Sequence, residues 1–326
     1  MPDQVKGTDT AIMLAFEDAG DYNGTIDTPA GYLMPFDSCG VLASQSNSEN
    51  NTILSGRHKG KPSRGNVDVG GSVVGLLGPN SAGIWFKALM GDHAKTGTGP
   101  FEHVFTVADD VPSFALQKDL GSKLGATRFE TFGGAKIASL DINLTQEGRQ
   151  SVTVNVKGAS QVFGAAALDA SPVDYRLDEP WDGLNLFIKE GGAQIGVANA
   201  ANLSISNNLD ESTGYTIPKE ADKLKAGTRQ SLSAQFLTIT GGLTALLTDT
   251  VLIQKGIDNI ESSLEFKLVR GTGDGTVGNE SLVLDIPNIV YERTSPDISG
   301  PAGLLFAANF EGFGGFTATL NNSEDL

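Results

Sequence analysis

The sequence predicts a mainly β fold in which one structural unit occurs twice. Apolar and polar residues alternate along most predicted elements, as they do in half-buried strands. Both halves of the 326-residue chain show the same order of elements, and the last strand pair in each opens on the same tripeptide, Leu140-Asp141-Ile142 and Leu284-Asp285-Ile286. A third observation, 41 glycines, indicates many turns and bulges. We therefore expect two tandem units, 1–170 and 171–326, each with one flanking α-helix.

The first half is predicted to form two strands, a short helix and then three strands. Asn80 or Ser81 can cap the helix and Gly91 can end it, while an apolar stripe formed by Ile84, Trp85, Ala88 and Leu89 covers one face of a sheet. The most regular element is a hairpin, because valines alternate with polar residues in 151–157 and the polar turn 147–149 precedes them. The predicted strands are 41–51, 65–77, 101–108 and the pair within 136–157.

The second half repeats this order with less regular patterns. Strands are predicted at 201–208, 226–239, 262–269 and as a pair within 282–309, and a helix is predicted at 241–253. Leu243, Leu246 and Leu247 suggest that helix, although several threonines interrupt it. Between the halves, residues 164–183 are rich first in alanine and then in proline and acidic residues, which predicts a linker with a boundary near residue 170.

The composition excludes several classes of protein. No apolar run approaches the roughly 18 residues of a membrane-spanning helix, and the stretch 11–16 is shorter than the core of a signal peptide, so we expect synthesis in a cytoplasm. The 39 acidic residues outnumber the 23 basic ones, and this net charge of -16 disfavours binding to nucleic acid or anionic membranes. The single cysteine, Cys39, is most simply a small core residue.

The motifs of catalysis and cofactor binding fail on inspection. His58, His93 and His103 are not at metal-ligand spacing, and no Gly-x-Ser-x-Gly turn is present. The segment 56–62 has one residue too few for a phosphate loop and ends in proline, and the calcium-like segment 21–27 has isoleucine where that loop needs glycine. The glycine-rich stretch 271–278 precedes a strand, which predicts a flexible hairpin tip. We expect no catalytic, cofactor or metal site, and no enzyme activity.

One basic segment stands out on this acidic chain. Arg57, Lys59, Lys61 and Arg64 lie close together between two predicted strands. The usual interpretation is a solvated loop. A basic arm on an acidic body is also attracted to the body of the next copy, so we keep an intersubunit arm as an equal alternative.

Several strings of residues occur in order along nearly the whole chain. They are Ala11-Ile-Met-Leu-Ala-Phe-Glu, Gly65-Asn-Val-Asp-Val-Gly-Gly-Ser, Ile84-Trp-Phe-Lys-Ala-Leu-Met-Gly, Phe101-Glu-His-Val-Phe with Pro112-Ser-Phe, Phe132-Gly-Gly-Ala-Lys-Ile-Ala-Ser-Leu, and Leu284-Asp-Ile-Pro-Asn-Ile-Val-Tyr leading to Ile298-Ser-Gly. In this order and spacing they resemble the tail tube proteins (major tail proteins) of long-tailed bacteriophages.

The resemblance implies a β-sandwich or partial barrel in each unit, with one flanking helix, and a structural function. Subunits of that family join their sheets into rings, and the rings stack into a hollow tube through which the genome is ejected. For a duplicated chain, a trimeric ring of pseudo-sixfold symmetry is favoured and a hexamer is the alternative. The hairpins that form the inner barrel in the family carry Asp141, Glu147 and Asp285, which we expect to face the lumen, although a solvated outer face is the alternative.

The same resemblance implies partners and a location. The expected partners are other copies of the chain, a tape measure protein and tail-end proteins, with DNA passing through transiently and without sequence specificity. The expected location is the virion tail, after synthesis and assembly in the cytoplasm of the bacterial host. A second class of function stays open, a virion or cell-surface β-sandwich that binds sugars or acts as an adhesin. The 2 tryptophans and 5 tyrosines give little material for a sugar site.

Overall fold

The computed structural model describes residues 4–52, 57–196, 198–217, 226–298 and 303–326, and within this part the fold is mainly β, as predicted. It has two α-helices, α1 (Ser81–Met90) and α2 (Val251–Asp258). Neither helix is long and apolar enough to cross a membrane. Three short 3-10 turns are Gly7–Asp9, Ser122–Leu124 and Gly183–Asn185.

The strands of the first half follow the predicted order with several additions. They are β1 (Ala11–Glu17), β2 (Ile26–Met34), β3 (Ser38–Cys39), β4 (Leu42–Asn50), β5 (Gly60–Leu76), β6 (Gly91–Thr96), β7 (Phe101–Val107), β8 (Phe114–Asp119), β9 (Phe129–Thr145), β10 (Ser151–Gly158), β11 (Ser160–Gly164) and β12 (Val173–Asp174). Those of the second half are β13 (Leu186–Glu190), β14 (Ala193–Gln194), β15 (Ala198–Ser206), β16 (Thr238–Leu246), β17 (Ser262–Val269), β18 (Ser281–Tyr291), β19 (Leu305–Phe313) and β20 (Thr317–Asn322).

The strands form two sheets that share β9. The smaller sheet has the order β12–β2–β1–β8–β9–β11 and uses residues 129–135 of β9. The larger sheet begins at β4 and continues β5–β10–β9–β15–β16–β19–β18–β17–β13–β14, using residues 136–145 of β9. From β18 a branch continues through β20 to β7 and β6. The larger sheet therefore crosses from one half of the sequence to the other.

Two long strand pairs join the halves, in addition to the short pairing of β12, just past residue 170, with β2. β9 pairs with β15 from Ser139↔Ser206 to Thr145↔Ala200, and the late strand β20 pairs with β7 from Thr317↔Thr106 to Asn322↔Phe101. The buried apolar side chains of both halves also belong to a single core cluster. The boundary near residue 170 stays a prediction.

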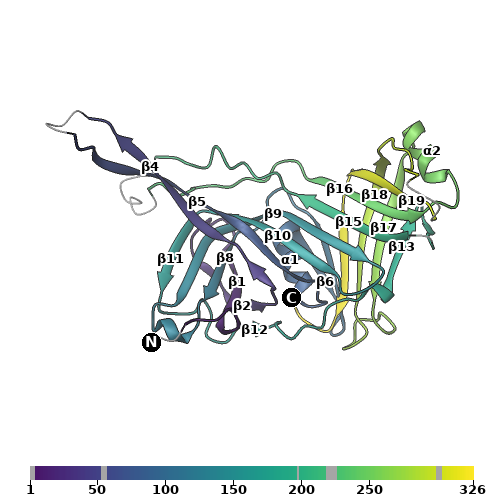
Figure 1. Cartoon of the computed structure of the whole chain (residues 1–326). Coiled ribbons are helices and arrows are strands. Elements are labelled where there is room, and N and C mark those ends of the chain that lie inside the picture. Colours follow the sequence, from purple (N-terminus) through teal and green to yellow (C-terminus); the bar gives the residue numbers. More distant parts are fainter. Residues whose placement is uncertain (1–3, 53–56, 197, 218–225, 299–302) are drawn as a thin grey trace.

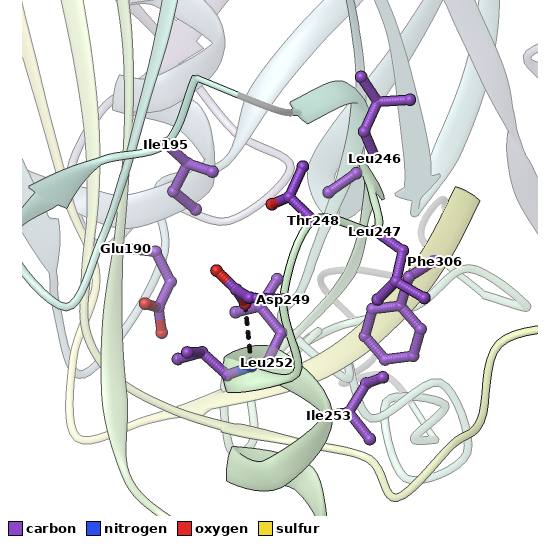
Figure 2. Close-up of a pocket in the computed structure, with 11 residues that line it drawn as sticks. Glu190, Ile195, Leu246, Leu247, Thr248, Asp249, Leu252, Ile253 and Phe306 are labelled. Carbon is purple, nitrogen blue, oxygen red and sulfur yellow. Dashed lines mark hydrogen bonds between the residues drawn. The ribbon is translucent and has the colours of Figure 1, made fainter. Parts of the chain in front are cut away.

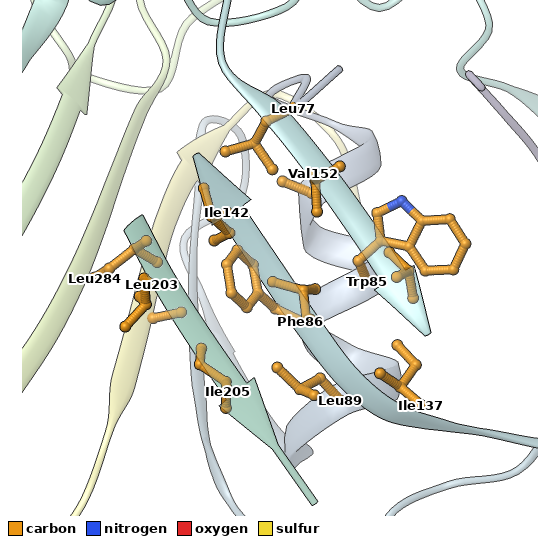
Figure 3. Packing of buried hydrophobic residues seen from close by; sticks show 14 of the residues in the cluster. Leu77, Trp85, Phe86, Leu89, Ile137, Ile142, Val152, Leu203, Ile205 and Leu284 are labelled. Carbon is orange, nitrogen blue, oxygen red and sulfur yellow. The ribbon is translucent and has the colours of Figure 1, made fainter. Parts of the chain in front are cut away.

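Helix α1 is the centre of this core. It was predicted with one apolar stripe, but Lys87 is the only one of its ten residues that is not buried. Phe86 points toward Ile142 of β9 and Leu203 of β15, with Leu284 of β18 beyond them (Figure 3). Because a helix that is apolar on all sides needs cover on all sides, α1 requires strands from both halves.

The N-terminus of α1 is capped from a distant part of the chain. Of the two predicted caps, Asn80 is the N-cap residue but its side chain makes no capping hydrogen bond, and Ser81 is the first residue of the helix itself. Instead one oxygen of the Asp178 carboxylate, Oδ2, accepts hydrogen bonds from the backbone N–H groups of Asn80 and Ser81, both at 2.9 Å, and from the Ser81 hydroxyl at 3.0 Å. The C-terminus is as predicted, since Gly91 ends the helix with φ +86°.

The connection between the halves packs against the first half and is not a loose linker. β12 pairs in parallel with β2, and Trp181 is buried, with 1% of its surface exposed. The Trp181 backbone N–H donates to the carbonyl of Leu77, and the Trp181 carbonyl accepts from the N–H of Gln150. Residues 175–181 therefore extend the packing around the start of α1.

The second half differs from the prediction in two places. Residues 226–237 form no strand, and β16 occupies Thr238–Leu246, which includes the start of the predicted helix 241–253. Among the described residues of this half the one α-helix is α2, which begins ten residues later than predicted. Ile239, Leu243 and Ala245 are buried while the threonines between them face the other way, so strand alternation decides this segment. The remaining predicted strands of this half are present.

Replacing Asp178 with alanine is expected to destabilise the fold by about 1–2 kcal/mol, since the carboxylate is the helix cap seen for α1. Burial raises the pKa of the Asp178 carboxyl, while the hydrogen bonds from Ser81 and Asn80 oppose that shift. Thermal and urea unfolding of the native protein and of Asp178→Ala measure this loss of stability. Asp174→Ala is the control, because the exposed Asp174 pairs only with Arg176 and its loss should cost little. Equal stabilities of the two variants would contradict the capping role.

Candidate functional site

The side of the larger sheet that points away from α1 is a broad polar surface, called here the polar face. Along β10, β9, β15, β16 and β19 every second residue is buried in the core and the residues between point outward. Most of the outward residues are serine, threonine or asparagine: Ser151, Thr153 and Asn155 on β10, Ser139, Asn143 and Thr145 on β9, Asn202, Ser204 and Ser206 on β15, Thr238, Thr240 and Thr244 on β16, and Asn309 on β19.

The strand register places these small polar side chains in rows across the sheet. One row runs from Thr153 through Asp141 and Ser204 to Thr240 and Glu311. Neighbouring side chains bond within and between the rows. The amide of Asn155 donates to the hydroxyl of Ser139 at 2.8 Å and to Asp141 at 3.0 Å, and Ser204 donates to the other oxygen of Asp141. The face is therefore a fixed lattice of short side chains.

Two of the three predicted acidic residues lie on this side of the sheet. Asp141 and Asp285 each stand between two buried residues of their shared tripeptide, on β9 and β18. Asp285 on β18 is paired directly with Glu265 on the neighbouring strand β17. The pKa of Asp285 is raised, first by burial and second by the like charge of Glu265. Glu147 is exposed in the β9–β10 turn, at the border of the polar face.

Basic residues are scarce on the polar face. On the outward positions of β10, β9, β15, β16 and β19 the only basic residue is Lys157, at the end of β10. Its ammonium lies 2.8 Å from the carboxylate of Glu211, which neutralises it. On the same side of the sheet, β13 adds Lys189, which lies 2.8 Å from Glu265, and β17 adds Lys267. It is therefore the part of the face formed by β10, β9, β15, β16 and β19 that offers phosphate groups almost no unpaired positive charge.

The predicted basic arm is a long, exposed hairpin of β4 and β5. We call residues 44–52 and 57–66 the arm; it projects from the body at the upper left of Figure 1. Arg57, Lys59, Lys61 and Arg64 are all exposed on it, and only Lys59 has an acidic partner on the arm, Glu49 at 3.1 Å. Prediction placed these residues in a loop between strands, but Lys61 and Arg64 belong to β5 itself.

Residues of the second half hold the base of the arm. We call the segments 209–215 and 226–230 the brace. The N–H of Val67 on β5 donates to the carbonyl of Gly227, and the carbonyl of Val67 accepts from the Tyr215 hydroxyl at 2.7 Å. These bonds occupy the backbone of β5 just where its pairing with β10 ends, at Val69↔Gly158.

Arg229 of the brace is 3% exposed and makes charged contacts where the arm joins the body. Its guanidinium donates to Asp68 of β5 at 2.6 Å and to the carbonyl of Gly158 at 3.0 Å, and it lies over the ring of Tyr215. Because Asp68 is on the arm side and Gly158 on the body side, Arg229 fixes the direction in which the arm leaves the body.

The sequence of the chain was compared with known protein families and with curated proteins. Residues 7–312, nearly the whole chain, match the family described as phage tail tube protein. The chain belongs to this family. No curated protein matches it.

Membership of the tail tube family gives the chain a structural role in the tail of a phage virion, as the resemblance predicted. In a tail tube protein a repeated surface matters more than a catalytic centre. The polar face, which carries the predicted residue Asp141, and the arm, which carries the predicted basic residues, are two such surfaces of this chain.

The histidines of this tail tube protein are less scattered than the sequence suggested. His93 on β6 and His103 on β7 lie side by side, with Nε2 of His93 2.9 Å from Nδ1 of His103. Nε2 of His103 donates to the carbonyl of Glu324, so in the neutral pair His93 is the donor to His103. Burial lowers the pKa of His93 to about 4 and also lowers that of His103. Within the described residues no three His, Cys, Asp or Glu side chains form a group suited to a metal ion.

Sequence reasoning missed Arg229 and Asp178 as organising residues of the tail tube protein. Each acts across a long stretch of chain, 161 residues from Asp68 to Arg229 and 97 from Ser81 to Asp178. Asp178 lay in the predicted linker 164–183, and Arg229 lay in the predicted strand 226–239, so neither segment indicated a long-range role. Cys39 is half-buried against the core, as expected, and burial raises the pKa of its thiol.

Arg229→Met is expected to loosen the arm without unfolding the body. Losing its charged hydrogen bonds costs about 1.5–3 kcal/mol locally, so amide hydrogen exchange in residues 60–68 should become about tenfold faster or more. Arg176→Met, which removes an exposed arginine paired with Asp174, is the matched control. Unchanged exchange in residues 60–68 of Arg229→Met would show that the brace holds the arm without this side chain.

Acid is expected to weaken the contact between the β6–β7 hairpin and residues 322–326. An unfolded histidine binds a proton near pH 6.5, but folded His93 does so only near pH 4. The unfolded state therefore binds more protons between these values, and stability falls as the pH falls from 6.5 to 4. For this half-buried group we expect a loss on the order of 1 kcal/mol between pH 7 and 5 after solvent screening.

Urea unfolding at several pH values measures this effect. His93→Gln keeps a donor for His103 but cannot take up the proton, so its stability should depend less on pH than that of the native protein. Parallel pH curves for the two proteins would remove His93 as the cause.

Proposed function

We propose that this tail tube protein assembles with copies of itself into stacked rings, and that the polar face lines the hollow tube through which the genome is ejected. The observation that carries this proposal is the composition of the polar face. Along β10, β9, β15, β16 and β19 it is wide and rich in short neutral side chains, it carries Asp141, and the one basic residue on the outward positions of these strands is paired. Such a lining stays hydrated and does not bind the DNA that passes along it.

Electrostatics explains why the scarcity of basic residues matters. A protein that makes 6–10 phosphate contacts through lysine and arginine loses about 10³–10⁵ in affinity between 50 and 200 mM salt, which means that it binds DNA strongly at low salt. A lining with several free lysines per subunit, repeated around a ring, would stall the genome. Asp141, Asp285 and Glu147 add repulsion at intervals along the face and its border.

The order of paired strands supports a duplicated unit. In the first half the neighbours are β4–β5–β10–β9, and in the second half they are β15–β16–β19–β18, with a helix after the second strand in each case. A chain with two such units fills two positions of a ring. We therefore favour a ring of three chains with pseudo-sixfold symmetry, and six chains is the alternative.

Further partners follow from this role. A tape measure protein would occupy the lumen before ejection, and tail-end proteins would cover the two ends of the stack. DNA is a transient occupant that the lining does not recognise. Synthesis and assembly take place in the cytoplasm of the bacterial host. The arm is proposed to contact a neighbouring copy, since a two-stranded hairpin standing alone in water is marginally stable.

Electron microscopy and native mass spectrometry of the purified protein test the assembly. We expect rings or tubes, and a smallest ring with the mass of three chains. A ring of six chains would replace the trimer but keep the tube. A protein that stays monomeric over a wide range of concentration would contradict the proposed function.

Three lysines on the polar face are expected to turn the tube into a DNA-binding tube. Asn143, Asn202 and Thr240 are exposed on β9, β15 and β16, so Asn143→Lys, Asn202→Lys and Thr240→Lys add charge without breaking any bond described above. Assembled tubes of this variant should retain short DNA at 50 mM salt and lose about 10³-fold or more in affinity by 200 mM.

The control carries lysines at Thr8, Thr96 and Ser122, which are exposed outside the polar face. Fluorescence anisotropy of labelled DNA compares the two variants. If both bind DNA equally, or neither does, the polar face is not the lining.

A further inference from the structure

The end of the molecule around α2 exposes an unusual amount of apolar surface. Five large apolar side chains there are each more than two-fifths exposed: Leu246 at the end of β16, Val251 and Ile257 on α2, Ile260 after it and Leu305 at the start of β19. We call this surface the α2 end. Exposed apolar side chains that cluster in this way mark an interaction site more often than those scattered singly.

α2 is held firmly enough to present this surface. The ammonium of Lys255 lies 2.6 and 2.8 Å from the two oxygens of Glu190 on β13, and the Ser262 hydroxyl donates to the same carboxylate at 2.6 Å. Glu190 is 8% exposed, so this ion pair is largely shielded from water. The backbone N–H of Val251 at the start of the helix donates to Asp249 at 2.9 Å.

A cavity of about 160 Å³ opens between α2 and the end of the larger sheet. Figure 2 shows Leu252 and Ile253 of α2 on one side of it and Ile195, Leu246 and Phe306 around the rest. Its lining is mainly apolar, with Glu190 and Asp249 as its charged members. It has room for one or two side chains of a partner.

The surface around α2 is acidic. Residues 247–261 and 291–293 carry four exposed carboxylates, Asp249, Asp258, Glu261 and Glu292, against one exposed base, Arg293. The other base, Lys255, is taken up by Glu190. A partner for the α2 end therefore has to combine positive charge with some apolar or aliphatic surface.

The arm has this chemistry. Residues 44–66 contain four basic residues and one acidic residue, while the chain as a whole has a net charge of -16. Lysine and arginine side chains also bring long aliphatic stems to an apolar surface. The arm and α2 lie at opposite ends of the molecule in Figure 1, so the arm of one copy can meet only the α2 end of another.

We propose that the α2 end is the docking site for the arm of a neighbouring copy of this chain. This inference rests on the proposed function and names the contact through which copies recognise each other. Each copy then gives one arm and receives one. A contact of that kind is heterologous, so it continues from copy to copy until a ring closes or a stack ends.

Charge reversal on each surface, alone and together, tests the pairing. The arm variant carries Lys59→Glu, Lys61→Glu and Arg64→Glu, and the α2-end variant carries Asp258→Lys, Glu261→Lys and Glu292→Lys. Asp249 is left intact because it bonds the start of α2. Light scattering gives the concentration above which each protein assembles, and circular dichroism confirms that each is folded.

We expect each variant alone to raise the assembly concentration at least tenfold, and the chain with all six changes to return to within about threefold of the native value. The matched control, Asp37→Lys, Glu102→Lys and Asp109→Lys, reverses three exposed carboxylates away from α2 and should assemble normally.

Normal assembly of either single-surface variant, or no recovery in the combined chain, would overturn the docking site while leaving the tube intact. If the native protein forms no rings or tubes, the proposed function itself fails, and the docking site falls with it. A third surface as the receiver of the arm would be revealed if the control variant failed instead.

Discussion

The pairing of β9 with β15 is the contact on which the rest of the structure depends. It turns the strands of two sequence halves into one sheet, and this sheet supplies enough apolar surface to bury every residue of α1 except Lys87. A half-chain would leave the helix partly uncovered and an open strand edge beside it, and open edges invite pairing with any available strand. Joining the halves internally removes that hazard along seven residue pairs. The side chains on the opposite side of the sheet are not needed for the core, so function alone can determine their composition.

That freedom explains the contrast between the two sides of the same strands. The inner side of β9 and β15 carries Leu140, Ile142, Leu203 and Ile205, all buried, whereas the outer side carries serine, asparagine and one aspartate. Short polar side chains that bond to one another project little and bind solvent. This surface fits the tube role of the family because it tolerates a polyanion nearby without attracting it. The arm concentrates the opposite charge at the periphery, away from that surface.

Much of this organisation could be predicted where a segment folds by its own pattern. The alternation in residues 136–157 determines the β9–β10 hairpin, and Gly91 ends α1 because a glycine suits its backbone angle. Residues 241–246 were assigned to a helix because Leu243, Leu246 and Leu247 fit a helical spacing. The burial of Ile239, Leu243 and Ala245 against partner strands, with threonines facing the other way, shows that the segment is a strand. Asp178, Arg229 and the pairing of β9 with β15 depend on contacts between distant residues, and a single sequence holds no record of such distances.

The place of β20 in the sheet has a consequence for folding. β20 lies between β18 and β7, although it follows both of them in the chain. The edge of β7 can therefore be covered only after a strand of the second half has reached it. Pairings between residues so far apart in a chain close slowly, because the entropy of a long loop is lost before the contacts form. The kinetics of folding, and not only the final stability, therefore depend on both halves.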